Sequence, residues 1–131
     1  MSEEIKFRAW DRRRKKMHMV GAIVWDNGKI VEVDADNGDL IKRYELMQFT
    51  GLTDSKRIEN YPEGQEIYEG DILPIWEHGE KYYYKVIYDG DCFMLAILDS
   101  DQGSYPLATK NYRSEVIGNI HDNPELLGAG A

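Results

Sequence analysis

The residues best suited to contact a charged partner form an unbroken basic run near the start of the chain. The run consists of Arg12, Arg13, Arg14, Lys15 and Lys16. Consecutive cations attract phosphate groups and carboxylates, so the run is a candidate contact for nucleic acid or for an acidic partner. A solvated turn between two strands accounts for the same residues, and we favour it because five residues make a short electrostatic footprint.

A cluster of tyrosines is the second candidate binding surface. Tyr82, Tyr83 and Tyr84 are consecutive, and aromatic rings of this kind stack on the bases of single-stranded nucleic acid. A stacking platform needs a basic groove, yet only Lys81 and Lys85 accompany the tyrosines, among several acids. We therefore expect one face of the segment to pack in the core. The other face is expected to be exposed or to line an interface, with Tyr82 and Tyr84 as candidate contacts.

Residue types that bind metals or carry out catalysis occur without a supporting motif. The histidines are His18, His78 and His121, and none lies near another in the sequence, as zinc motifs require. The only cysteine, Cys92, begins an apolar segment and is expected to be buried and inert. The sequence also lacks the serine elbow of hydrolases and the glycine-rich loops that bind nucleotide phosphates. We therefore expect no catalytic residue, no metal and no cofactor.

The charge of the chain is distributed unevenly. The 131 residues include 16 basic and 24 acidic side chains, which gives a formal net charge of −8. Seven of the basic side chains but only three acids lie in the first sixteen residues, so the rest of the chain is strongly acidic. An acidic surface repels phosphate backbones, which disfavours nucleic-acid binding by most of the molecule.

The sequence carries no pattern for export or membrane insertion. Its longest apolar segment, residues 92–98, is far shorter than the ~20 residues of a membrane-spanning helix. The N-terminus begins with acids and has no apolar signal segment, and a single cysteine cannot form an internal disulfide. We expect a cytoplasmic protein that does not contact membranes.

Short alternating or β-branched segments separated by turn residues dominate the chain. Asn27 and Gly28 lie between two apolar segments and predict a type I′ hairpin turn, because both residues tolerate positive φ. Pro74 cannot donate a hydrogen bond within a sheet, so it is expected at an edge or a bulge. Residues 40–52 fit either a strand or a helical turn followed by a strand. The expected strands cover residues 5–10, 17–25, 30–33, 66–76, 82–88, 92–98 and 114–120, with an exposed loop at 53–65 and a helical turn at 122–127.

These elements predict a mainly-β fold. Many short strands with turns every ~8–12 residues are typical of a small β-barrel or sandwich. We expect residues 66–120 to form an SH3-like second half, preceded by an N-terminal β-hairpin layer and followed by a short C-terminal helical turn. The chain length fits a single domain, residues 1–131, with a soft internal boundary in the 53–65 loop.

Four sequence blocks, in order along nearly the whole chain, carry a resemblance to a known family. The blocks are Ile5–Asp11, Leu46–Leu52, Glu66–Ile72 and Glu115–Leu127. Together they resemble the YopX family of phage and prophage proteins. The segment between the second and third blocks departs from the family pattern, because it is longer than the usual turn and contains Pro62. The resemblance implies a small, mostly-β, cytoplasmic protein of phage or prophage origin, and a homo-oligomer, but no activity.

The blocks consist largely of glycine and apolar residues, which a fold needs more than a reaction does. Gly51, Gly70 and Gly118 are expected in tight turns or bulges, where glycine tolerates unusual backbone conformations. The apolar residues expected to fill the core are Trp10, Met47, Tyr68, Ile72 and Ile117.

These observations leave two classes of function open. The first is an accessory protein of phage origin that binds a host or phage protein, or itself, without catalysis. The alternative is a nucleic-acid-binding protein that uses the basic residues 12–16 together with nearby aromatic side chains. An enzyme is the least supported class, because no catalytic group was found in a recognisable pattern.

Overall fold

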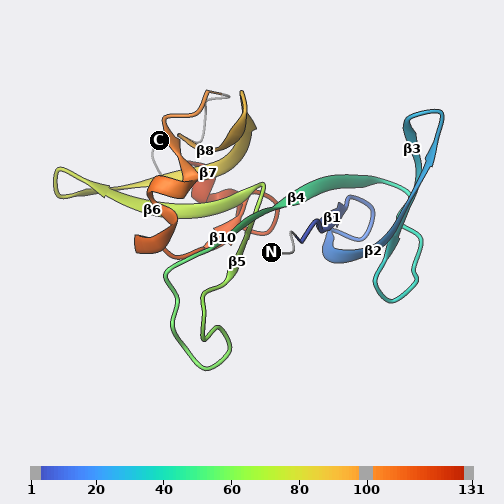
Figure 1. The fold of residues 1–131 in the computed structure, drawn as a ribbon, viewed down its shortest axis with the longest axis horizontal. Helices are drawn as coiled ribbons and strands as arrows, with labels where there is room; N and C mark the ends of the chain where they lie inside the picture. Colours follow the sequence, from blue (N-terminus) through green and yellow to red (C-terminus); the bar gives the residue numbers. More distant parts are fainter. Residues whose placement is uncertain (1–3, 98–101, 129–131) are drawn as a thin grey trace. The chain divides into compact units, whose positions relative to one another are not determined.

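Two sheets of antiparallel strands, joined by tight turns, make up most of the protein (Figure 1). The computed structural model describes residues 4–97 and 102–128. The strand orders are β3-β2-β1-β4-β5 and β10-β6-β7-β8-β9, and neither sheet closes into a barrel among these residues. The predicted mainly-β class is therefore confirmed, whereas a closed barrel is not found.

The chain divides into an N-terminal unit, Met1–Phe49, and a C-terminal unit, Thr50–Ala131. The division lies within strand β4 (Tyr44–Thr53), a few residues before the loop in which the sequence predicted a soft boundary. The ambiguous segment 40–52 is therefore a strand from Tyr44 onward. That both units fold together as one domain stays a prediction.

The N-terminal unit is built on β1, which pairs with β2 on one side and with β4 on the other. β2 and β3 form the long hairpin drawn in blue in Figure 1. Its turn has φ values of 52° at Asn27 and 77° at Gly28, so the predicted conformation with positive φ at both positions is confirmed. The bounds are β1 (Phe7–Asp11), β2 (Lys16–Asp26) and β3 (Lys29–Ala35).

The core of the N-terminal unit is small. Four fully buried side chains form it: Ala9, Val33, Ala35 and Ile41. Ile41 is the largest of them and precedes β4 rather than lying in a strand. Its backbone N–H donates to the Val33 carbonyl at 2.9 Å, which fixes the segment between β3 and β4 against the hairpin.

The C-terminal unit has the larger core. Strands β6, β7 and β8 pair in sequence order as an antiparallel meander, and the short β9 and β10 lie at its two edges. The buried cluster comprises Ile67, Leu73, Ile75, Tyr84, Val86, Leu95, Leu107 and Val116. The remaining elements are β5 (Glu66–Tyr68), β6 (Asp71–Glu77), β7 (Glu80–Asp89), β8 (Cys92–Ile97), β9 (Tyr105–Pro106), η1 (Leu107–Thr109), η2 (Asn111–Arg113), β10 (Gly118–Asn119) and η3 (Pro124–Gly128).

The strand predicted over residues 114–120 is wrong in extent, because only Gly118–Asn119 pair in a ladder. The polar groups that precede these two residues have other partners. The Ser114 hydroxyl donates to the Pro74 carbonyl at 2.6 Å, and the Val116 N–H donates to the Asp54 carboxylate at 2.8 Å. Pro74 lies in β6, which is an interior strand rather than the predicted edge, but β10 pairs only with Asp71 and Ile72, so Pro74 has a strand partner on the β7 side alone.

Two predicted core positions are wrong. Cys92 is exposed, because it pairs with Asp89 beside the β7–β8 turn and lies beyond the core. Ile117 is 44% exposed, since it lies on the side of its segment opposite the buried Val116. Met47, Tyr68 and Ile72 are buried as predicted, and Trp10 is half-buried.

The loop expected to be exposed over residues 53–65 contains a buried anchor. Asp54 is 1% exposed, and its carboxylate accepts hydrogen bonds from the backbone N–H groups of Lys56, Gln65 and Val116 at 2.8–3.0 Å. The Lys56 ammonium also contacts the Asp54 carboxylate, with 3.2 Å between Nζ and Oδ2. Residues 57–63 are exposed as predicted, and the buried Asp54 is the exception that the sequence did not reveal, because its partner Val116 lies far along the chain.

Candidate functional site

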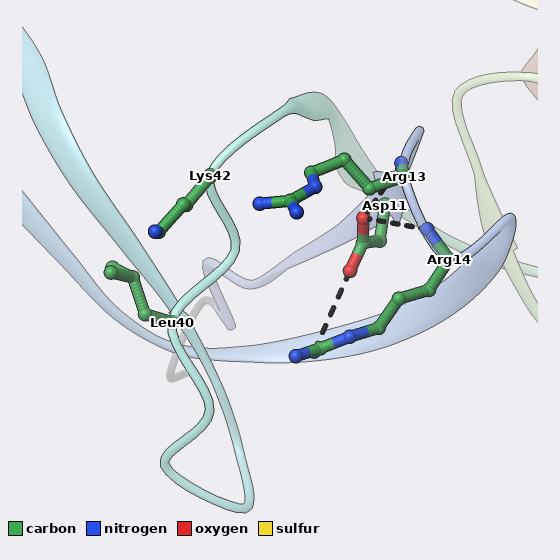
Figure 2. A pocket seen from close by; sticks show the side chains of 5 residues that line it. All are labelled: Asp11, Arg13, Arg14, Leu40 and Lys42. Carbon is green, nitrogen blue, oxygen red and sulfur yellow. Dashed lines mark hydrogen bonds and ion pairs between the residues drawn. The ribbon is translucent and has the colours of Figure 1, made fainter.

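The basic run lies where the sequence places it, in the turn between β1 and β2, and beside it is a hollow of about 290 Å³. In Figure 2, Arg13 extends from the turn toward the segment that carries Leu40 and Lys42, and Arg14 runs along the other side. The Asp11 carboxylate lies between the two arginines. The lining is therefore polar and mostly cationic, within the N-terminal unit alone.

Asp11 holds the turn in place. Its side chain is nearly buried, and one carboxylate oxygen accepts hydrogen bonds from the backbone N–H groups of Arg13 at 3.0 Å and Arg14 at 3.2 Å. This is the local hydrogen-bond pattern by which aspartate stabilises turns. The second oxygen lies 3.7 Å from the Arg14 guanidinium. Because Asp11 supports the turn backbone, the other side chains of residues 12–16 remain directed to solvent, and all five are exposed.

A second segment brings further cations to the turn. The Arg12 N–H donates to the Arg43 carbonyl at 2.9 Å, so residues 40–43 lie directly beside the turn. Ile41, buried in the core of the N-terminal unit, anchors this segment. Lys42 and Arg43 directly follow Ile41, and both are exposed. Sequence analysis missed both residues, although the Lys-Arg pair was visible within the segment whose structure was ambiguous.

We call the combined set the basic cluster: Arg12, Arg13, Arg14, Lys15, Lys16, Lys42 and Arg43. Two acids form ion pairs with the cluster and partly offset its charge. Asp11 pairs with Arg14, and Glu45 pairs with Arg12 at 3.7 Å. Both arginine side chains in these pairs remain more than half exposed, so water screens the pairs and leaves the cations able to contact a partner. Seven cations against two acids give the cluster a strong local positive charge.

The candidate tyrosines differ in their availability. Tyr82 is 40% exposed, and its hydroxyl donates to Glu80 at 2.7 Å; this bond and the Glu80 charge raise the pKa of Tyr82. Tyr84 is only 3% exposed and belongs to the core of the C-terminal unit. Burial, and then its hydrogen bond to Glu77, raise the pKa of Tyr84 above its usual value. Tyr84 therefore offers no ring face for stacking, and the prediction that it is a contact residue is wrong.

The tyrosines belong to the C-terminal unit, whereas the basic run belongs to the N-terminal unit. That Tyr82 lies near residues 12–16, as the nucleic-acid hypothesis requires, stays a prediction.

The remaining candidates for chemistry are dispersed. His18 lies in β2, and His78 and His121 lie in turns. Over residues 4–97 and 102–128, no three histidine, cysteine, aspartate or glutamate side chains come together as metal ligands. Within the same residues, no helix is long and apolar enough to cross a membrane.

Comparison with known proteins places this arrangement in a family. The family model described as YopX protein matches residues 6–128, which is nearly the whole chain. The chain belongs to the YopX family. A crystal structure of protein EF1440 from Enterococcus faecalis is similar over 96% of this chain and 99% of that one, with 31% sequence identity and a TM-score of 0.65. Among functionally curated proteins, nothing matches.

The first two YopX-like blocks form the paired strands β1 and β4, and the last two also shape turns and loop contacts. Gly70 has a φ of 85° and lies in the turn between β5 and β6, where its N–H donates to the Val86 carbonyl at 2.9 Å. In the last block, the Asn119 side-chain oxygen accepts the N–H groups of His121 and Asp122, both at 2.9 Å. The segment that departs from the family pattern is the one anchored by the buried Asp54.

Proposed function

We propose that this YopX-family protein binds nucleic acid through the basic cluster of its N-terminal unit. The observation that carries the proposal is the hydrogen bond between the Arg12 N–H and the Arg43 carbonyl, which joins two basic segments into one surface. The five-residue run alone is a short footprint; with Lys42 and Arg43 the positive surface comes from two sides of a hollow.

A phosphate backbone is the ligand that this chemistry suits best. Arginine presents several N–H donors in a planar fork that matches the oxygens of a phosphate, and lysine adds a point charge. Arg13 and Lys42 line the hollow, and no ion pair with either of them is found among the described residues. The hollow contains little apolar surface, so it favours a charged backbone over an apolar ligand.

The test is the salt dependence of binding to a dye-labelled DNA duplex, followed by fluorescence anisotropy. Binding is expected to weaken steeply with salt, with a logarithmic slope of about −0.9 for each phosphate neutralised. The double variant Arg13→Glu/Lys42→Glu is expected to reduce this slope by about two. Lys29→Glu is the matched control, because Lys29 is an exposed lysine of the same unit that lies in the distant hairpin turn. The proposal is ruled out if Lys29→Glu weakens binding as much as Arg13→Glu/Lys42→Glu does, or if binding does not depend on the salt concentration.

Self-association is the second candidate function, favoured by the β2–β3 hairpin. β3 is the outermost strand of its sheet, and unpaired strand edges readily pair with another chain. Three large apolar side chains of the hairpin are exposed: Val24 at 43%, Trp25 at 59% and Val31 at 58%. Such a surface suits a second copy of the chain or a protein partner of the phage or host.

Sedimentation velocity tests this second candidate. We expect a concentration-dependent dimer that Val31→Lys converts to a monomer. Ile97→Lys is the control, because Ile97 is a similarly exposed β-branched residue of the C-terminal unit. A wild-type protein that remains monomeric at high concentration would exclude self-association through the hairpin.

The family and the dispersed reactive groups support a wider proposal. We propose that the protein is a non-catalytic accessory factor of a bacteriophage or prophage that acts in the cytoplasm of a bacterial host. Expression during phage induction, followed by fractionation of the host cell, tests both parts. We also propose an SH3-like arrangement for the C-terminal unit, supported by its β6–β8 meander and testable by an experimental structure.

A further inference from the structure

A second hollow, of about 190 Å³, lies in the C-terminal unit beside the most exposed tryptophan. Trp76 is 68% exposed, whereas aromatic rings without a partner usually withdraw from water. The hollow is smaller than the ~300–1,000 Å³ of pockets that enclose a whole small molecule. It therefore suits one flat ring laid on the surface. Its lining consists of Pro74, Ile75, Trp76, Lys110 and Arg113.

The strand register separates cations from carboxylates on the two faces of the β6–β7 hairpin. Trp76 pairs with Lys81, and Pro74 pairs with Tyr83, so these four side chains share one face. The Lys81 ammonium lies 5.8 Å from the centre of the Trp76 ring and 5.3 Å from that of Tyr83. This face of the hairpin therefore offers aromatic rings accompanied by positive charge.

The nearby acids lie on the opposite face of the same hairpin. Glu77 pairs with Glu80 across the strands, one position away from the pair of Trp76 and Lys81. Glu77 accepts the Tyr84 hydroxyl and Glu80 accepts that of Tyr82. The two carboxylates are thus held away from the hollow by their tyrosine partners.

Two more cations border the hollow from the other side of β6. Lys110 and Arg113 belong to the helical turns that follow β9, and Leu107, fully buried in the core, anchors these turns. The next residue after the turns, Ser114, donates its hydroxyl to the Pro74 carbonyl at 2.6 Å. This bond ties the cationic segment to the edge of β6, so the cations and Trp76 share one surface.

The gathering of cations is unusual for this part of the chain. The C-terminal unit carries six basic and fifteen acidic side chains. Three of the six, Lys81, Lys110 and Arg113, surround Trp76, and no acid lines the hollow. The exposed Trp76 indole, with three cations beside it in an otherwise acidic unit, is complementary to a ligand that is both aromatic and anionic.

We propose that the Trp76 surface binds single-stranded nucleic acid, with a base stacked on the indole ring and the flanking phosphates held by Lys110 and Arg113. The inference takes its class of ligand from the proposed function but uses a different surface in a different unit. A duplex hides its bases within the helical stack, so only an unpaired strand can offer a free base to Trp76. The surface thus adds a preference for single strands to the phosphate contacts of the basic cluster.

The test compares labelled oligonucleotides by fluorescence anisotropy on the full chain. The probes are oligothymidine, oligouridine, an abasic strand of equal length and a DNA duplex. We expect both thymidine and uridine strands to bind more tightly than the abasic strand and the duplex, and the tighter of the two identifies DNA or RNA as the source. Trp76→Ala is expected to weaken single-strand binding about 5- to 150-fold, the range for loss of one stacking ring. Lys110→Glu/Arg113→Glu is expected to reduce the salt slope by about 1.4.

Trp25→Ala is the matched control, because Trp25 is 59% exposed and lies in the other unit. Circular dichroism checks that each variant is folded. We expect Trp76→Ala to fold, because Trp76 is largely exposed and contributes little to the core. If Trp76→Ala binds the thymidine and uridine strands as tightly as the wild type does, the inference is wrong. If Trp76→Ala leaves single-strand binding intact while Arg13→Glu/Lys42→Glu abolishes binding, the proposed function of the basic cluster stands and only the Trp76 site is wrong. The reverse result, loss with Trp76→Ala and none with the basic-cluster variant, would instead overturn the proposed function and retain this site.

Discussion

The two units of this protein are built from the same kind of antiparallel strand but differ in charge and core. The N-terminal unit carries ten basic and nine acidic side chains around four fully buried residues. The C-terminal unit carries six basic and fifteen acidic side chains, around a cluster of eight buried apolar residues and the buried carboxylates of Asp54 and Asp71. The net charge of −8 thus comes from the second unit, and a chain-wide value conceals the first unit's basic cluster.

This difference suggests a division of roles. The C-terminal unit has the larger buried core and therefore the greater hydrophobic stabilisation, since that stabilisation grows with buried apolar area. The N-terminal unit places most of its distinctive side chains on the surface, in the basic turn and the exposed hairpin. Away from the Trp76 surface, we expect mutations in the C-terminal unit to affect mainly stability, whereas mutations in the smaller N-terminal unit should affect both stability and binding.

The largest expected effect concerns Asp54. Asp54→Ala removes the acceptor of three backbone N–H groups and leaves the Lys56 ammonium, only 16% exposed, without its carboxylate. Loss of one partner of a buried ion pair destabilises by about 3–5 kcal/mol. Urea unfolding followed by far-UV circular dichroism measures the change. Glu59→Ala, an exposed acid of the same loop, is expected to leave stability unchanged, and equal effects of the two variants would contradict the buried anchor.

The next largest effect tests the small core of the N-terminal unit. Ile41→Ala deletes its largest buried side chain, and such a deletion costs about 2–5 kcal/mol. The same change releases residues 40–43, so nucleic-acid affinity should fall together with stability. Val24→Ala is the control, because Val24 is 43% exposed and lies in the β2–β3 hairpin of the same unit, outside the lining of the hollow. A stable Ile41→Ala variant with wild-type affinity would show that this segment does not position Lys42.

The pH dependence of unfolding follows from the same Asp54. Burial by itself raises the pKa of Asp54, but the hydrogen bonds from Val116, Gln65 and Lys56 and from the Lys56 ammonium outweigh it, so the pKa is lowered. A lowered pKa in the folded state means that the unfolded chain binds the proton more readily. The contribution of Asp54 is therefore complete above its unfolded pKa of ~3.9 and is lost as the pH falls through the folded value. Asp54→Asn should flatten the acid limb of the stability curve, and an unchanged limb would contradict the assignment.

The smallest effect concerns the exposed pair of Arg12 and Glu45. Their side chains are 59% and 41% exposed, and exposed ion pairs contribute about 0–1 kcal/mol. Glu45→Gln should therefore leave the unfolding free energy nearly unchanged. It should nevertheless strengthen nucleic-acid binding slightly, because it frees one cation of the basic cluster. A weaker affinity in this variant would contradict an attractive role for the cluster.

Local features of the fold were predictable from the sequence, and distant contacts were not. The hairpin at Asn27 and Gly28 depends only on the backbone preferences of two adjacent residues, and it was predicted correctly. The union of the basic turn with Lys42 and Arg43 depends on the pairing of β1 with β4, which no local pattern reveals. Asp54 was missed for the same reason, since its partner Val116 lies far along the chain.

The incorrect prediction of Tyr84 as a contact residue has a related cause. Alternation along residues 82–88 predicts two faces but does not say which one the core covers. Tyr84 is on the buried face, whereas Trp76, which no sequence pattern singles out as a contact, is on the open one. The cations beside Trp76 come from helical turns that follow a short strand absent from the sequence prediction. Charge and aromaticity therefore indicated the class of ligand that we propose but only part of the surface that we propose for it.

The most direct test of the account is the map of backbone amide shifts when isotopically labelled protein is titrated with an oligonucleotide at low salt. The account predicts that shifts concentrate at residues 12–16 and 42–43 for a duplex. A single strand should add shifts around Trp76 and Arg113, while the rest of the acidic C-terminal unit remains unchanged. An absence of shifts at the basic cluster, or shifts confined to the β2–β3 hairpin, would contradict nucleic-acid binding as the central function.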